Sequence, residues 1–105
     1  MVTMVNKFTV SDDPEKFAQV WEESSEFMRN QPGFINFRLV RSLSDPQVYF
    51  NISDWKDAES HGRVLHSSAF QDHIAELAAL AVPEPNMCEV VIECSTPTGQ
   101  PQKGR

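Results

Sequence analysis

The sequence predicts a single α+β domain in which helices cover one face of an antiparallel sheet of four strands. The length of 105 residues fits one domain. Four stretches alternate between apolar and polar residues as strands do, and the stretches between them repeat apolar residues at helical spacing. Their order is strand, helix, strand, strand, helix, helix, strand, which is the ferredoxin-like arrangement.

The first strand and the first helix have clear sequence signals. Residues 2–10 alternate, and Asn6 lies in the middle of the apolar row of that strand. We expect Asp13 to cap the following helix, with Pro14 at its first position. Apolar residues then recur at helical spacing, and the residues of "QPG", 31–33, end the helix because proline cannot continue it and glycine permits a tight reversal.

The middle of the chain predicts a hairpin and two helices. Residues 33–43 and 47–55 have strand character, and the short turn at 44–46 makes them an antiparallel pair. Residues 56–64 predict a weak helix that Gly62 interrupts. A stronger helix begins at Ser67 or Ser68 and is stopped by Pro83.

The last predicted strand covers residues 86–94, so we place one domain at residues 1–95. Residues 96–105 are polar and hold two prolines and two glycines, which predicts a disordered or partner-wrapping tail. Cys88 and Cys94 lie six residues apart in one strand, roughly 20 Å at about 3.3 Å per residue. A disulfide needs less than about 7 Å, so we expect free thiols.

Charge and hydropathy limit the classes of partner. The net charge of −6 disfavours phosphate backbones and anionic lipids, so we expect neither nucleic acid nor membrane as a partner. The first residues do not resemble a signal peptide, and no run approaches 18 apolar residues, so we expect a cytoplasmic protein. Because the helices leave one apolar sheet face bare, we expect two copies to form a homodimer through it.

Several polar residues interrupt the predicted core. Asn51 and Trp55 share a pleat face, and His73 lies on the apolar stripe of the last helix. Each asparagine has an alternative structural role, satisfying a backbone group. Trp55, at the end of its strand, has the alternative of filling the core, and His73 that of a hydrogen-bonded core residue. We expect His61 and His66 at the surface, with no spacing typical of a metal site. These residues favour an apolar pocket for a flat aromatic ligand that carries oxygens.

Four stretches carry a resemblance to a known family. They are "VNKFTV", "QPGFINFRLVRS", "VYFNISDW" and "HSSAFQDHIAEL". Together they resemble the antibiotic biosynthesis monooxygenase superfamily, whose members are dimeric α+β barrels, and the similarity covers about residues 2–94. The asparagine of the first strand and the N-x-x-x-W of the third are similar to the cofactor-independent anthrone monooxygenases of aromatic polyketide biosynthesis, of the nogalamycin and actinorhodin type.

The resemblance implies a reaction and a site. The implied reaction oxidises an anthrone to a quinone with O2 and without a cofactor, through a carbanion of the substrate. It implies that Asn6, Asn51 and Trp55 line the cavity, with the asparagines as donors to an oxyanion and His73 as a candidate base. We expect the substrate also to contact apolar side chains, namely Phe8, Phe37, Val64 and Phe70.

Two alternatives stay open at this point. A haem-binding or haem-degrading branch of the superfamily also has an asparagine on the first strand and a histidine on the last helix, which Asn6 and His73 match. That branch has a helix-borne tryptophan where this chain has Val64. A dimeric binding module without catalysis is the second alternative.

Overall fold

The structure is a computed structural model that describes residues 1–95; the predicted tail of residues 96–105 lies outside the described residues. Its elements follow the predicted order. They are β1 (Val2–Val10), α1 (Pro14–Met28), β2 (Phe34–Arg41), β3 (Val48–Trp55), α2 (Ala58–Leu65), α3 (Ser68–Ala78) and β4 (Ala81–Glu89). The predicted fold class is therefore confirmed.

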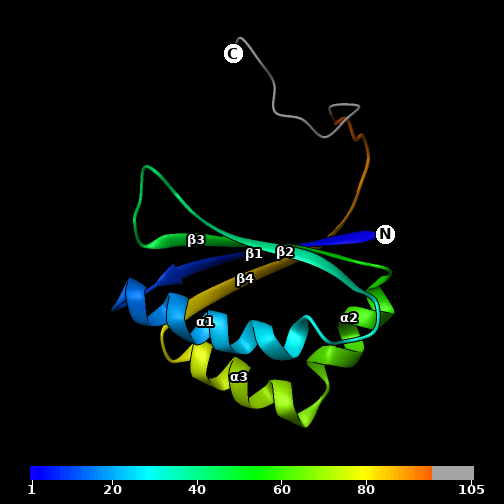
Figure 1. Ribbon diagram of the computed structural model, residues 1–105. Helices are drawn as coiled ribbons and strands as arrows, with labels where there is room; N and C mark the ends of the chain where they lie inside the picture. Colours follow the sequence, from blue (N-terminus) through cyan, green and yellow to red (C-terminus); the bar gives the residue numbers. More distant parts are fainter. Residues whose placement is uncertain (96–105) are drawn as a thin grey trace.

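The four strands form one antiparallel sheet in the order β2-β3-β1-β4. All three helices lie on the same side of this sheet, and the other side is open (Figure 1). The central strands are β1 and β3, and β4 is an edge strand. Residues of β1 and β3 that face the helices are therefore the most enclosed part of the sheet.

The predicted start of α1 is confirmed, and the helix ends at Met28, a few residues before the predicted stop at residues 31–33. The Asp13 side chain caps the helix by accepting a hydrogen bond from the Glu15 N–H at 3.0 Å, and Pro14 is the first helical residue. Gly33 has a φ of +89°, in the left-handed region that glycine adopts without a steric penalty. Its carbonyl accepts from the Lys56 N–H at 2.7 Å, which joins the reversal after α1 to the end of β3.

Two predicted boundaries are wrong. α3 ends at Ala78 rather than at Pro83, and β4 begins at Ala81 and ends at Glu89 rather than covering residues 86–94. The two prolines of β4 misled the prediction, because proline usually ends regular structure. β4 is an edge strand, where a residue without an N–H is tolerated.

Gly62 does not interrupt α2, which continues from Ala58 to Leu65. An internal glycine costs roughly 1 kcal/mol relative to alanine. The Asp57 side chain offsets part of this cost by accepting from the Ser60 N–H at 2.8 Å. Burial of His61 and Val64 on one side of α2 fixes the helix against the sheet.

The core lies between the sheet and the helices and is rich in aromatic rings. Phe8 of β1 packs against Phe17 and Trp21 of α1, with ring centroids 5.2 and 5.4 Å apart, and Phe17 also contacts Tyr49 of β3. Edge-to-face and tilted rings at such distances add to the stability that area burial provides. This cluster closes one end of the space beneath the sheet.

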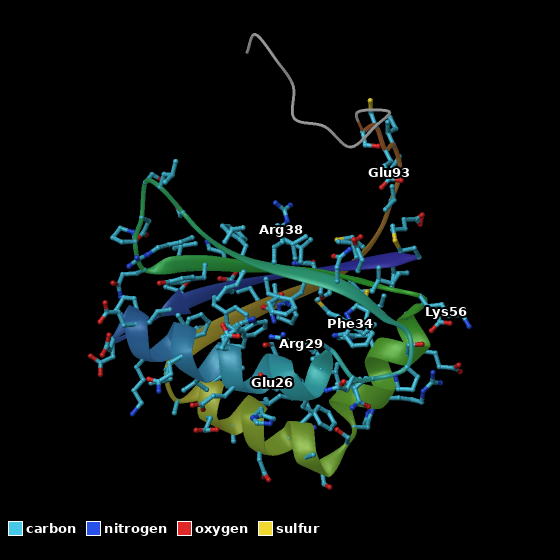
Figure 2. The ribbon with its side chains drawn as sticks, in the orientation of Figure 1. Glu26, Arg29, Phe34, Arg38, Lys56 and Glu93 are labelled. Atoms are coloured by element: carbon cyan, nitrogen blue, oxygen red, sulfur yellow. The ribbon has the colours of Figure 1, made fainter. Side chains whose placement is uncertain are left out.

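The open face of the sheet keeps apolar side chains partly exposed. Val5, Phe50 and Ile52 are half-buried there, and Arg38 points away from the helices (Figure 2). Cys88 and Cys94 are free and exposed. Among the described residues, no helix has the length and apolar character that a membrane crossing requires.

Candidate functional site

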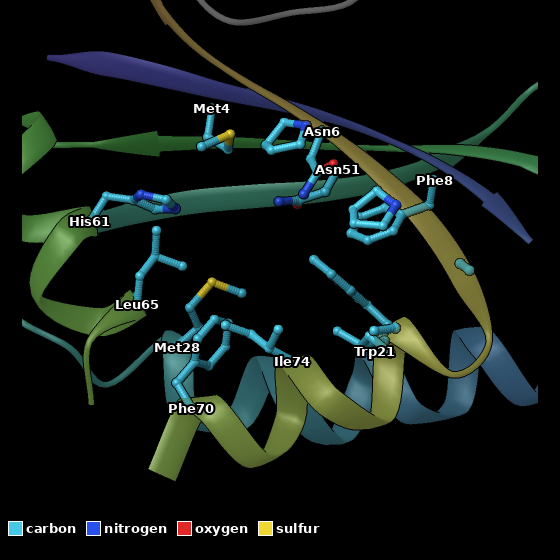
Figure 3. Close-up of a pocket in the computed structure, with 15 residues that line it drawn as sticks. Met4, Asn6, Phe8, Trp21, Met28, Asn51, His61, Leu65, Phe70 and Ile74 are labelled. Carbon is cyan, nitrogen blue, oxygen red and sulfur yellow. The ribbon is translucent and has the colours of Figure 1, made fainter. Parts of the chain in front are cut away.

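A cavity of about 220 Å³ lies between the sheet and the helices. Most of its wall is apolar, and Figure 3 shows the larger apolar side chains that line it: Met4, Phe8, Met28, Leu65, Phe70 and Ile74. Ala78, Pro83 and Pro85 also line it and are exposed, so the cavity reaches the surface between α3 and β4. Its volume is below the roughly 300 to 1,000 Å³ common for ligand pockets, which suits a compact planar guest.

Two carboxamide side chains project from the sheet into this cavity. Asn6 of β1 is the direct cross-strand partner of Asn51 of β3, and both line the cavity (Figure 3). Cβ atoms of directly opposed residues lie about 4.5 to 5.5 Å apart, so both carboxamides reach the same small region. Side chains alternate across a strand, so each asparagine lies in the helix-facing row of its strand, and the register of β1 and β3 makes the two direct partners.

Asn6 has a structural contact as well as a place in the cavity. Its Oδ1 accepts a hydrogen bond from the Glu84 N–H at 3.1 Å. Pro83 and Pro85 have no N–H, so Glu84 supplies the one backbone donor of this proline-flanked segment. The contact occupies Oδ1, and no hydrogen bond within the described residues occupies Nδ2. The Asn6 N–H₂ group is thus available to a guest.

Two other polar atoms in the cavity wall have no partner. Trp21 and Asn51 are 5% and 4% exposed, and Trp21 Nε1 and Asn51 Oδ1 are buried without a hydrogen bond within the described residues. One is a donor and the other an acceptor. Leaving such groups unpaired costs roughly 1 to 3 kcal/mol each, and buried unpaired groups are rare in folded proteins. A guest that both accepts and donates, such as a hydroxyl group, would satisfy the pair.

His61 is the cavity residue that sequence reasoning missed. It was expected at the surface, but it is 8% exposed and its ring lines the cavity. Burial lowers the pKa of His61 from 6.5, so the imidazole is neutral at pH 7. The spacing of His61, Val64 and Leu65 is helical, which is a signal that could have placed it inward. The reading of Gly62 as an interruption hid that signal.

Trp55 lies behind His61. It is fully buried, and its ring meets the His61 ring edge-on with centroids 5.1 Å apart. Its indole N–H donates to Ser53 Oγ at 3.1 Å and is therefore already occupied. Trp55 is not among the residues that line the cavity. Trp55 therefore fills the core, as its alternative role predicted, and does not face the substrate as the resemblance implied, because His61 of α2 lies between its ring and the cavity.

The other expected residues divide into two groups. Phe8 and Phe70 line the cavity, whereas Phe37, Val64 and His73 do not. Phe37 packs against Trp21, with ring centroids 6.3 Å apart. Val64 belongs to the buried core.

His73 lies between α1 and α3, 6.5 Å from the Phe27 ring and 6.2 Å from the Phe70 ring. Its stripe position turns it toward α1 rather than toward the sheet. The asparagine of β1 and a histidine of α3, the pair on which the haem alternative depends, are therefore not brought together in this cavity. Among the described residues, no cluster of three or more histidine, cysteine, aspartate or glutamate side chains could hold a metal ion.

The arrangement can bind a flat apolar guest and stabilise charge on its oxygens. Hydrogen-bond donors are available from Asn6, Trp21 and the N–H₂ of Asn51, an acceptor from Asn51 Oδ1, and a neutral imidazole from His61. Polar groups in an apolar cavity interact more strongly with a developing charge than they do in water. Such a set suits proton removal from an acidic carbon whose negative charge moves onto oxygen.

Comparison with known proteins gives a consistent picture. The chain is 36% identical over 83 residues to a deoxynogalonate monooxygenase of Streptomyces nogalater, covering 79% of this chain and 70% of that protein. A crystal structure of SnoaB, a cofactor-independent oxygenase from the same organism, superposes with a TM-score of 0.82 and 32% identity, covering 91% of this chain and 96% of that one. A structure of a SnoaB variant superposes with a TM-score of 0.85, at 32% identity over 88% of this chain and 94% of that one.

The family model described as antibiotic biosynthesis monooxygenase matches residues 1–76. This match covers the sheet residues and helices that surround most of the cavity. The chain therefore belongs to the antibiotic biosynthesis monooxygenase family.

Proposed function

We propose that this protein is a cofactor-independent monooxygenase that oxidises an anthrone-type aromatic polyketide to a quinone. The observation that carries the proposal is the pair of facing carboxamides, Asn6 and Asn51, in an otherwise apolar cavity. The similarity to a deoxynogalonate monooxygenase and to the cofactor-independent oxygenase SnoaB supports the same reaction class.

The chemistry of an anthrone fits this cavity. Loss of one methylene proton leaves a carbanion whose charge delocalises onto the ring oxygen as an enolate. The carbanion donates one electron to O2, and the resulting radical and superoxide combine to form a C–O bond. The hydroperoxide then loses water, which leaves a carbonyl where the methylene was. One oxygen atom of O2 enters the quinone and the other leaves as water, so the substrate itself is the reductant.

The polar groups of the wall have separate roles in this reaction. The free N–H₂ of Asn6 and the carboxamide of Asn51 donate to the enolate oxygen, where negative charge develops. Trp21 Nε1 donates to a second oxygen of the guest and Asn51 Oδ1 accepts from a hydroxyl, which orients the ring system. The apolar wall excludes water and holds the polycycle flat against Phe8 and Phe70.

Dithranol, a simple dihydroxyanthrone, tests the proposal. We expect the purified protein to accelerate its conversion to the quinone above the spontaneous rate, measured by quinone absorbance. With ¹⁸O₂, mass spectrometry should find one labelled oxygen in the product. Asn51→Ala should lower kcat by about 10²- to 10³-fold, the effect of removing one oxyanion donor.

Asn30→Ala is the matched control, because Asn30 is exposed beyond the end of α1. It should oxidise dithranol at the wild-type rate. Equal rates for wild type and Asn51→Ala would contradict the role of the carboxamide. A folded protein that binds the quinone but never exceeds the spontaneous rate would instead identify a binding module.

We also propose that two copies pack through the open face of the sheet. Val5, Phe50 and Ile52 are half-buried on that face. The segment of residues 90–95 leaves the sheet on the same side (Figure 1) and exposes Val91 and Ile92 by 83% and 89%. A second copy would cover both groups.

A further inference from the structure

We propose that His61 is the general base that removes the methylene proton of the substrate. The inference rests on the oxygenase function proposed above and names a catalytic residue for it. It replaces His73, whose ring lies between α1 and α3 rather than in the cavity.

His61 is the sole ionisable residue that lines the cavity within the described part of the chain. The wall that faces it is formed by uncharged side chains from β1, α1, β3, α3 and β4. On its own helix, Glu59 and Arg63 are exposed and pair with each other at 3.3 Å. Asp57 is engaged with the Ser60 N–H as the helix cap. A proton lost inside the cavity therefore has one side chain to accept it.

The His61 ring is held in place by packing, and its nitrogens make no hydrogen bond within the described residues. Trp55 packs edge-on against it, and the Trp55 N–H is directed to Ser53 instead. No hydrogen bond within the described residues occupies either imidazole nitrogen of His61. Burial also lowers the pKa of His61, which keeps the unprotonated form present at neutral pH. The base form is thus both available and oriented.

The position of His61 relative to the carboxamides suits proton removal. Figure 3 shows His61 at one end of the cavity, Trp21 and Phe8 at the other, and Asn6 and Asn51 between them. A guest that extends along the cavity places an oxygen at the carboxamides and a ring carbon toward His61. The base and the oxyanion donors then act on opposite ends of one conjugated system.

The proton and electron changes balance with O2 as the oxidant. The C–H bond breaks, the proton moves to an imidazole nitrogen, and the electron pair stays on the substrate as the enolate. After the C–O bond forms, the imidazolium returns the proton to the peroxide oxygen. His61, again neutral, takes the second C–H proton as the O–O bond breaks, and the departing hydroxide takes this proton from the imidazolium to leave as water, which returns His61 to its neutral form.

Hydrogen exchange without oxygen isolates this step from oxygenation. In D₂O under nitrogen, wild-type protein should exchange the methylene protons of dithranol for deuterium, measured by NMR. His61→Gln should slow this exchange by about 10²- to 10⁴-fold, the usual contribution of a general base. In air its kcat should fall by a similar factor with KM within about twofold, and added imidazole should restore part of the rate.

His66→Gln is the matched control, since His66 is exposed on the outer end of α2. It should exchange at the wild-type rate. The pH profile gives a measurement on unaltered protein. Burial lowers the pKa of His61 below 6.5, and His61 can accept a proton only above its pKa. The exchange rate should therefore fall as the pH drops through this pKa, which NMR titration of His61 measures.

The outcomes separate the two proposals. The assignment of the base is overturned if His61→Gln exchanges the methylene protons within threefold of the wild-type rate. It is also overturned if the exchange rate does not change with pH around the measured pKa of His61. Exchange that depends on His61 without any oxidation in air supports the base and overturns the oxygenase. Wild-type protein that neither exchanges nor oxidises dithranol overturns both.

Discussion

At the scale of single residues, the candidate site depends on polar atoms that the fold leaves without partners. The wall of the cavity would be more stable with apolar residues at these positions, because unpaired buried groups are costly. Trp21 Nε1 and Asn51 Oδ1 are such groups, one from α1 and one from β3. A guest that pairs with both groups would remove this cost.

Trp21→Phe tests this interpretation directly. Removing the N–H should weaken binding of 1,8-dihydroxyanthraquinone by about fivefold, which corresponds to about 1 kcal/mol for one hydrogen bond. Binding of anthracene, which has the same three rings and no oxygen, should not change beyond the effect of the smaller side chain. Fluorescence titration of wild type and Trp21→Phe with each ligand gives the Kd values to compare. An equal loss for both ligands would mean that Trp21 contributes packing alone.

Alternation along a strand predicts which face of the sheet a side chain occupies. It placed Asn6 in the apolar row of its strand and Asn51 on one pleat face with Trp55, and the family resemblance implied that both asparagines line a cavity. Both line the cavity between the sheet and the helices. Trp55 obeys the same alternation and is buried, but His61 from α2 lies between it and the cavity. The pattern within one segment cannot show that a side chain from another element, here His61, lies between a buried residue and the cavity. The unpaired state of the Trp21 N–H also arises only from three-dimensional packing.

At the scale of elements, two glycines show how local structure positions the site. Gly33 has a left-handed backbone, and a Cβ there would overlap the Ser60 side chain at the start of α2. Gly62 lies inside α2, and a Cβ there would meet no atom within 4 Å. The first glycine allows the loop after α1 to pass close to α2, whereas the second only weakens the helix that carries His61.

The two glycine substitutions should therefore have opposite effects. Gly33→Ala should lower the free energy of unfolding by more than about 1 kcal/mol, through backbone strain and the overlap with Ser60. Gly62→Ala should raise it by about 0.5 to 1 kcal/mol, because alanine is the better helix former. Urea unfolding followed by circular dichroism compares them. A destabilised Gly62→Ala protein would contradict the open surroundings of that position.

Element boundaries were least predictable around the prolines of β4. The sequence rule that proline stops regular structure extended the expected α3 to Pro83 and delayed the expected strand. In the fold, β4 lies at the sheet edge, where residues without a backbone N–H are tolerated. Glu84 between them donates its N–H to Asn6. Only knowledge of the strand order, which no local pattern contains, resolves the assignment.

At the scale of the whole molecule, the sheet has two unequal faces. Helices cover one face and enclose the cavity, and the other has no cover within the described residues (Figure 1). The order of elements predicted this asymmetry, because two helical connections on the same side cannot cover both faces. The exposed apolar residues after β4, which include Val91 and Ile92, extend the uncovered surface. A small domain gains stability when such surface is buried.

Ile52→Glu tests whether this face joins two copies. Ile52 lies on β3 in the middle of the open face, paired with Val5 on β1 and Arg38 on β2. In a sheet-to-sheet dimer, two glutamates would be taken out of water in the interface, and this desolvation costs several kcal/mol even with Arg38 beside each of them. Light scattering after gel filtration should therefore give a dimer mass for wild type and a monomer mass for Ile52→Glu.

The control is Gln19→Glu, which adds the same charge at an exposed position of α1 on the helical side. It should keep the dimer mass, and circular dichroism should show both variants folded. A wild-type monomer, or a dimer that tolerates Ile52→Glu, would place the interface elsewhere. Because the cavity opens between α3 and β4 on the other side of the sheet, a folded Ile52→Glu monomer should retain binding of 1,8-dihydroxyanthraquinone. Loss of binding on dissociation would mean that the partner completes the site.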